Sequence, residues 1–181
     1  MNLPNKITIA RVCLIPVYLF VYLAQPFSEV PNMWLALTIF SVASITDAVD
    51  GYVAKRYGLV SNFGKLMDPL ADKLLVSAAL IAFVASGTLS AWVVVLIISR
   101  EFFVSGIRQL CVEQGIVIAA SPSAKFKTIT QMVLIIYILL PLAMFKFDWI
   151  VISLTVITVL ASLYSGIEYA VKNRSVFGKA S

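Results

Sequence analysis

The stretch Asp47-Ala48-Val49-Asp50-Gly51-Tyr52-Val53-Ala54-Lys55, followed by Gly64, Asp68 and Asp72, decides how this chain folds and acts. The chain holds nine Asp and Glu residues in all, and four of them stand in this segment of an otherwise strongly apolar sequence. Ionisable side chains in membrane-spanning helices cost a few kcal/mol each on insertion scales. Four carboxylates at one place therefore need a compensating partner, and a bound cation is the simplest one.

The composition indicates a helical integral membrane protein. Of the 181 residues, 61% are hydrophobic and 13% are charged, whereas a soluble domain is close to half apolar and a quarter charged. The apolar runs are continuous rather than alternating, which favours helices over a barrel. The net charge of +5 is attributed to the inner membrane face and to phosphate binding, not to nucleic acid. Cys13 and Cys111 have no metal-like spacing and are expected to be small buried apolar residues.

Six apolar segments approach the roughly 20 residues that a spanning helix needs. We expect them over residues 7–25, 33–57, 67–87, 90–111, 124–146 and 148–171, joined by short connections into one membrane domain, 1–181. The first segment would act as an insertion signal without being cleaved. Lys and Arg gather at the chain ends and at alternate turns, while the opposite turns hold one basic residue, Lys146. Both termini should therefore be cytoplasmic, in an all-α multi-pass protein of the inner (cytoplasmic) membrane.

The acid cluster should lie at one depth, close to the cytoplasmic face. The second expected helix is apolar from Met33 to Ile45, a length of about 20 Å at 1.5 Å per residue, before Asp47 appears. The third expected helix has Asp68 and Asp72 at its beginning. A chain that leaves one helix at this level and enters the next at the same level brings the acids together. The site should then open toward the cytoplasm.

The acid positions suit a metal site made of oxygen ligands. Asp47 and Asp50 are three residues apart, and Asp68 and Asp72 are four apart, so each pair shares one helix face. The chain has no histidine, which excludes Ser-His triads and most zinc sites. Carboxylates alone suit Mg²⁺ or Mn²⁺, with substrate phosphates as further ligands. Two such ions would clamp both sides of a phosphoryl displacement.

Two glycines accompany the acids. Gly51 removes a side chain where a ligand would approach the metals, and Gly64 loosens the turn into the next helix. In the alternative interpretation the acids only cap helix ends, as Asp68 before Pro69 would, or form pairs with neighbouring cations, namely Arg56, Lys65 and Lys73. The four spacings and the two glycines together favour the metal site.

The pattern D-x-x-D-G-x-x-A-R-x8-G-x-x-x-D-x-x-x-D is the signature of the CDP-alcohol phosphatidyltransferase family, and this chain resembles it. The family comprises six-helix membrane enzymes of phospholipid synthesis. Lys55 stands where the family usually has Arg, with Arg56 beside it. The other positions match at every spacing: Asp47, Asp50, Gly51, Ala54, Gly64, Asp68 and Asp72.

The resemblance implies a role for each of these residues. Asp72 would act as the general base toward the acceptor hydroxyl. The ligands of two Mg²⁺ or Mn²⁺ ions would be Asp47, Asp50, Asp68 and Asp72. The nucleotide site would be lined by Asp47, Gly51, Ala54, Lys55 and Gly64. An alcohol would attack the phosphoryl group next to the diacylglycerol of CDP-diacylglycerol and release CMP.

Basic residues near the expected site favour an acceptor that already carries a phosphate. The segment Ser99–Arg108 ends the fourth expected helix, and Lys125-Phe126-Lys127-Thr128 begins the fifth, both at the cytoplasmic end. Four cations would bind the acceptor phosphate: Arg100, Arg108, Lys125 and Lys127. Arg100 would lie deeper than the others and pair with Glu101. Their alternative role is inner-face topology charge.

Three blocks narrow the resemblance: Asn2–Arg11, Asp68–Lys73 and Arg100–Arg108 look like those of bacterial family members that use glycerol 3-phosphate and make phosphatidylglycerol phosphate. The implied partners are CDP-diacylglycerol, glycerol 3-phosphate and the lipid bilayer, with a homodimer left open. A cardiolipin, inositol-phosphate or serine type of acceptor stays open, although basic residues argue against serine. A small cation or proton transporter is a remoter alternative, because the acids lie near one surface and no repeat is visible.

Overall fold

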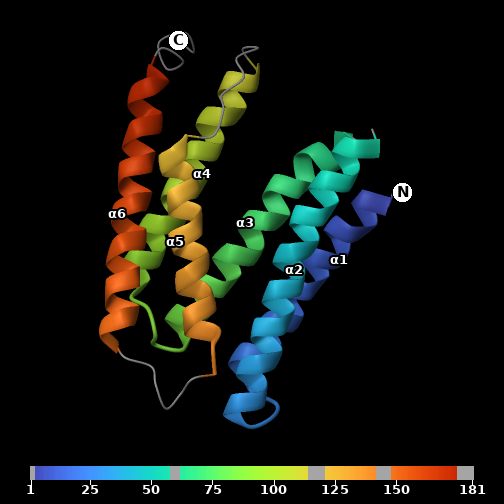
Figure 1. Ribbon diagram of the computed structural model, residues 1–181, viewed down its shortest axis with the longest axis vertical. Helices are drawn as coiled ribbons and strands as arrows, with labels where there is room; N and C mark the ends of the chain where they lie inside the picture. Colours follow the sequence, from blue (N-terminus) through green and yellow to red (C-terminus); the bar gives the residue numbers. More distant parts are fainter. Residues whose placement is uncertain (1–2, 58–61, 114–120, 142–147, 175–181) are drawn as a thin grey trace. The chain divides into compact units, whose positions relative to one another are not determined.

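Every regular element in the described part of this computed structural model is helical. Residues 1–2, 58–61, 114–120, 142–147 and 175–181 lie outside that part, as do the side chains of residues 3–7, 47–57, 62–69, 72 and 113. The elements in chain order (Figure 1) are α1 (Leu3–Leu19), the π-helical turn η1 (Phe20–Ala24), α2 (Glu29–Tyr57), α3 (Asn62–Ala85), α4 (Ala91–Glu113), α5 (Pro122–Leu139) and α6 (Asp148–Lys172). The expected sequence of helices is confirmed.

Four helix boundaries differ from the expected ones by more than a single turn: α1 begins at Leu3 and α2 at Glu29, and the largest differences are the end of α5 and the start of α3. The expected helix over 124–146 is wrong at its end, because α5 stops at Leu139. Pro141 lacks a backbone N–H and disfavours the helical conformation of the residue before it. The helix expected from residue 67 begins instead at Asn62. Asp68 is therefore not a helix N-cap, and Gly64 lies in the first turn of α3 rather than in the preceding turn.

The chain divides into two compact units, Met1–Leu89 with Leu139–Ala143, and Ser90–Ile138 with Met144–Ser181. Unit 1 packs α1, η1, α2 and α3 around an aromatic cluster. The ring of Tyr18 lies 6.0 Å from that of Tyr22 and 6.2 Å from that of Phe40, and the ring of Tyr22 lies 5.5 Å from that of Phe83. Fully buried alanines let these helices approach closely: Ala36, Ala43, Ala79 and Ala82.

Unit 2 contains α4, α5 and α6, and α4 packs on α6. Its buried apolar side chains come mainly from α4 and α5, and include Ile97, Val104, Ile107, Leu134 and Ile135. The buried face of α6 is made of smaller or polar residues instead: Thr158, Ser162, Ser165, Gly166 and Tyr169. These positions recur every three or four residues and so share one side of the helix.

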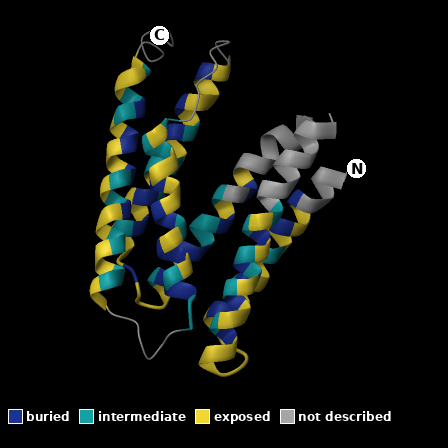
Figure 2. Ribbon diagram, viewed as in Figure 1, coloured by how far each residue is buried: buried dark blue, intermediate teal, exposed yellow. Residues whose placement is uncertain are grey.

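Many large apolar residues are exposed, and Trp92 is 80% exposed. Figure 2 shows exposed positions along the helices. Among the described residues, α6 is the one helix whose length and hydropathy suffice for a membrane span. Charged residues interrupt the apolar sequence of α4, in which Arg100, Glu101 and Arg108 stand. Cys111 is buried, as expected, but Cys13 is exposed, so the expectation for Cys13 is wrong.

Candidate functional site

The acid motif lies on two helices that pack against each other in unit 1. Asp47 and Asp50 belong to the C-terminal part of α2, and Asp68 and Asp72 to the N-terminal half of α3. The backbone is helical at all four positions, so each pair keeps the spacing that places both residues on one helix face. The side chains of all four acids lie outside the described residues, as do those of Gly51, Ala54, Lys55 and Gly64.

The residue types of the motif fit a divalent cation. Four carboxylates on two packed helices offer hard oxygen ligands, which Mg²⁺ and Mn²⁺ prefer. Among the side chains that the structure describes, no three His, Cys, Asp or Glu residues form a metal-binding group.

Arg11 connects α1 to α2 beside this motif, which the sequence did not predict. The Arg11 side chain donates its Nε–H to the backbone carbonyl of Ala43 over 3.1 Å, and the residue is only 2% exposed. Ala43 stands four residues, about one helical turn, before Asp47. The charge pattern alone predicts only a role in membrane topology for Arg11. A buried cation therefore contacts the backbone of α2 about one helical turn before Asp47.

Arg100, Glu101 and Lys127 form a compact charged group in unit 2. The Arg100 Nη1 donates to the Glu101 Oε1 at 3.0 Å, and the Lys127 Nζ donates to the same oxygen. The exposed fractions of the three side chains are 9%, 21% and 3%. The expected pairing of Arg100 with Glu101 is confirmed. One carboxylate thus faces two cations, which leaves this largely buried group with a net positive charge and makes it suited to an anion.

The other two residues expected to bind the phosphate, Arg108 and Lys125, have surroundings that differ from those of this group. Arg108 donates from Nη2 to the hydroxyl of Tyr169 at 2.9 Å, and its guanidinium lies 5.5 Å from the centre of the Tyr169 ring. Lys125 is exposed in the first turn of α5. The structure therefore gathers Arg100 and Lys127 on Glu101, and holds Arg108 on α6.

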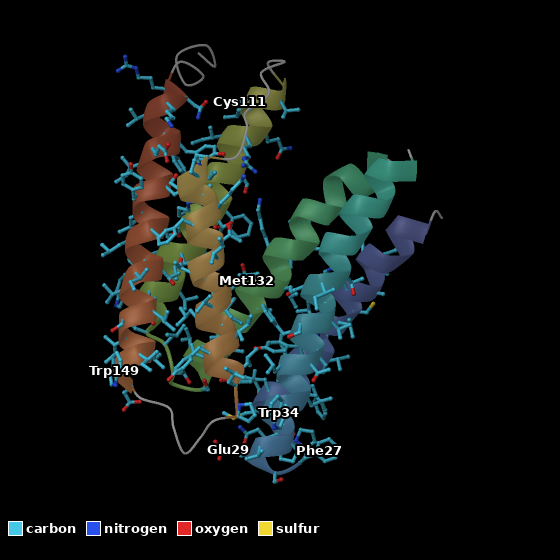
Figure 3. The ribbon with its side chains drawn as sticks, viewed as in Figure 1. Phe27, Glu29, Trp34, Cys111, Met132 and Trp149 are labelled. Carbon is cyan, nitrogen blue, oxygen red and sulfur yellow. The ribbon has the colours of Figure 1, made fainter. Side chains whose placement is uncertain are left out.

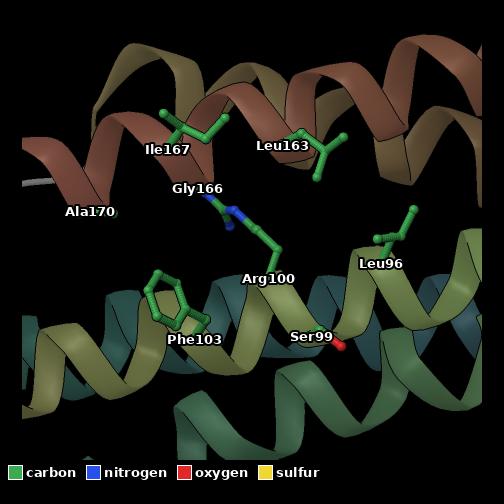
Figure 4. A pocket seen from close by; sticks show the side chains of 8 residues that line it. All are labelled: Leu96, Ser99, Arg100, Phe103, Leu163, Gly166, Ile167 and Ala170. Carbon is green, nitrogen blue, oxygen red and sulfur yellow. The ribbon is translucent and has the colours of Figure 1, made fainter.

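Helix α6 supplies contacts to both arginines. Ser165 accepts a hydrogen bond from the Arg100 Nη2, and Figure 4 shows Arg100 reaching from α4 toward Gly166 of α6. A pocket of about 450 Å³ lies here, lined mainly by apolar side chains with Arg100 and Ser99 among them. Nothing in the sequence analysis singled out Ser165, Gly166 or Tyr169. Their recurrence on one helix face is the only sequence signal, and many buried helices share it.

The start of α5, which carries Lys127, is fixed by its own cap. The backbone N–H of Ala124 donates to the Ser121 Oγ at 3.3 Å, and Pro122 occupies the first helical position. Ser123 donates to Glu168 of α6, which also pairs with Lys172. These bonds join the beginning of α5 to the end of α6 and so fix the position of the first turns of α5, which carry Lys127.

The sequence profile of the CDP-alcohol phosphatidyltransferase family matches residues 1–161, so Ser165, Gly166 and Tyr169 lie beyond the matched range. A Bacillus subtilis protein named CDP-diacylglycerol–glycerol-3-phosphate 3-phosphatidyltransferase is 45% identical over 95% of both chains. A Rickettsia bellii protein of the same name is 42% identical over 72% of this chain and 71% of its own. A Mycobacterium tuberculosis protein, named a probable phosphatidylglycerophosphate synthase, is 39% identical over 78% of this chain and 68% of its own.

Proposed function

We propose that this chain, which belongs to the CDP-alcohol phosphatidyltransferase family, transfers the phosphatidyl group of CDP-diacylglycerol to glycerol 3-phosphate. The products are phosphatidylglycerol phosphate and CMP, and the reaction is a step of phospholipid synthesis. Relatives named for this activity, at 39–45% identity, support it. The observation that carries the choice of acceptor is the buried group of Arg100, Glu101 and Lys127, because its net positive charge suits a phosphorylated alcohol.

The proposed roles in the acid motif follow its chemistry. Asp47, Asp50, Asp68 and Asp72 would hold one or two divalent cations, which when bound would neutralise the diphosphate and lower the barrier to departure of CMP. Asp72 would also take the proton of the attacking acceptor hydroxyl. The cytidine diphosphate would lie along α2 and the start of α3, against the remaining motif residues Gly51, Ala54, Lys55 and Gly64.

The acceptor phosphate would bind to the basic residues of unit 2. Arg100 and Lys127 would form the floor of this site, and their ion pairs with the Glu101 carboxylate, which bring their charged ends together, support this role. Arg108, fixed on Tyr169, and the exposed Lys125 would complete the positive field from the cytoplasmic side. A phosphate bound there would hold the acceptor by its charged end and leave a hydroxyl free to attack.

The proposed setting is the cytoplasmic membrane, with six spans in one domain, both termini inside and the active site facing the cytoplasm. The three tryptophans support this arrangement, because Trp34, Trp92 and Trp149 stand near the beginnings of α2, α4 and α6. In an alternating topology these helix ends share the outer interface, where tryptophan is enriched. Figure 3 shows Trp34 close to the turn before α2 and Trp149 at the start of α6.

Purified protein in mixed micelles tests this function directly. CDP-diacylglycerol is supplied with Mg²⁺ or Mn²⁺ and with one acceptor at a time: glycerol 3-phosphate, glycerol, serine, inositol phosphate or phosphatidylglycerol. We expect the fastest CMP release with glycerol 3-phosphate. An equal or faster rate with another acceptor would overturn the acceptor assignment, and no CMP release with any acceptor would overturn the transferase.

A further inference from the structure

Two arginines of α4 end on one short stretch of α6. Arg100 donates to the hydroxyl of Ser165, and Arg108 donates to the hydroxyl of Tyr169 while lying over its ring. Ser165 and Tyr169 are four residues apart and share a helix face, and both are buried. The charged ends of these long side chains are thus held by α6 and do not move freely in solvent.

Gly166 provides the space that Arg100 needs. A Cβ atom at position 166 would lie 3.0 Å from the Arg100 Cγ and 3.9 Å from its Nε. The arginine side chain therefore crosses α6 where the helix has no side chain of its own (Figure 4). An alanine at this position would force the Arg100 Cγ to shift by a few tenths of an ångström.

Arg100 retains hydrogen-bonding capacity in this position. A guanidinium carries five N–H donors, and two of its nitrogens bond to Glu101 and Ser165. The buried Nε has no partner among the described residues. Because Lys127 shares the Glu101 carboxylate, an incoming anion meets two cations that are already placed and largely desolvated. Such pre-positioned charge binds an anion without first paying the entropy of ordering a long side chain.

We infer that Ser165, Gly166 and Tyr169, the α6 contact face, form a positioning device that sets the affinity of the enzyme for the phosphate of its acceptor. Ser165 and Tyr169 fix the ends of Arg100 and Arg108, and Gly166 keeps the path of Arg100 open. This inference rests on the proposed function. The three residues touch the arginines and act through them, so their effect falls on acceptor binding and not on CDP-diacylglycerol.

Gly166→Ala is the first test, with Gly106→Ala of α4 as its matched control. A Cβ at Gly106 would meet no atom within 4 Å, so the same substitution there adds a methyl group without a collision. We expect Gly166→Ala to raise the KM for glycerol 3-phosphate about tenfold, with the KM for CDP-diacylglycerol unchanged. Gly106→Ala should leave both KM values unchanged.

Ser165→Ala and Tyr169→Phe are the second test, and they keep the result decisive if Gly166→Ala fails to fold. Each removes one hydroxyl and should raise the KM for glycerol 3-phosphate about three- to tenfold. Tyr169→Phe keeps the ring under Arg108 and so isolates the hydrogen bond. The controls are Ser153→Ala and Tyr164→Phe, which lie on exposed positions of the same helix.

A double substitution separates positioning from general loosening of the helix pair. In an Arg100→Ala background, Gly166→Ala should add nothing to the KM, because the side chain that it displaces is gone. A full additional increase in that background would overturn the inference, and so would an unchanged KM in all three single variants of an otherwise active enzyme. A wild type that prefers an unphosphorylated acceptor would overturn both this inference and the proposed acceptor, whereas active wild type with unaffected variants would overturn the inference alone.

Discussion

At the scale of single residues, the four aspartates lead to a metal prediction. We expect CMP release to stop in EDTA and to return with Mg²⁺ or Mn²⁺, because the motif offers only hard oxygen ligands. Asp47→Asn, Asp50→Asn and Asp68→Asn should each raise the Mg²⁺ concentration needed for half-maximal activity and lower turnover. Asp72→Asn should retain CDP-diacylglycerol binding and lose the chemical step, if proton removal is its main task. Full activity in chelator would contradict the metal-dependent mechanism.

Lys55 gives a second prediction at this scale. Both Lys55 and Arg56 lie in α2, which is helical through Tyr57, and neighbouring helix positions point about 100° apart. Counted from Asp47, position 55 lies about 80° around the helix and position 56 about 180°, so Lys55 is the nearer of the two to the side of Asp47. We expect Lys55→Ala to weaken use of CDP-diacylglycerol by about 1–2 kcal/mol, the order of a charge-assisted hydrogen bond, and Lys55→Arg to be tolerated. Arg56→Ala is the matched control; a large rise in the KM for CDP-diacylglycerol in that variant alone would reverse the assignment.

Single residues also show where sequence reasoning succeeds and where it ends. The pairing of Arg100 with Glu101 was predictable, because two opposite charges next to each other in an apolar helix need a partner. The charge of Lys127 predicts a role in phosphate binding, but its contact with the Glu101 carboxylate follows only from the packing of α5. Ser165 and Gly166 carry no such signal, since small residues at helix spacing are common in membrane helices. Their contact with Arg100 depends on how α4 meets α6.

At the scale of elements, Glu101 joins α4 to α5 and yields a stability prediction. Glu101→Gln leaves Arg100 and Lys127 close together without their shared carboxylate, and both are at least nine-tenths buried. Removing one partner of such a group costs on the order of 3 kcal/mol, so the thermal midpoint in detergent should fall by several degrees. Glycerol 3-phosphate should raise that midpoint more in the variant than in the wild type, because it restores negative charge. Glu29→Gln, at the exposed start of α2, is the control and should change neither value.

The helix boundaries show how far the elements could be predicted from the sequence. Hydrophobic runs identified all the helices of the described chain, but α5 stops before Pro141 although apolar residues continue past it. Helix α3 begins at Asn62, in a polar segment that hydropathy alone assigned to a connection. Backbone chemistry explains the first difference. The second arises because hydropathy marks only the apolar part of a helix, whereas α3 begins in polar residues.

At the scale of the whole molecule, the remaining question is how the chain crosses the membrane. Arg100 contacts Ser165, and Arg108, which comes later in α4, contacts Tyr169, which comes later in α6. Helices α4 and α6 therefore run in the same direction, as alternate crossings require. From the distribution of Lys and Arg we expect the starts of α2, α4 and α6 to lie outside. An inverted chain would turn the acid motif and the basic residues of α5 away from the cytoplasm.

Single cysteine reporters test this orientation. In a Cys13→Ala, Cys111→Ala background we expect Ser28→Cys and Ser90→Cys, before α2 and α4, to react with a membrane-impermeant maleimide in intact spheroplasts. Arg174→Cys, after α6, should react only once the membrane is permeabilised. All three positions are exposed, so access depends on the side of the membrane and not on burial. The cysteine-free parent is the control: it should release CMP as the wild type does and take up no label. Labelling of Arg174→Cys alone in intact spheroplasts would invert the proposed topology, and equal labelling of all three would contradict alternate crossings altogether.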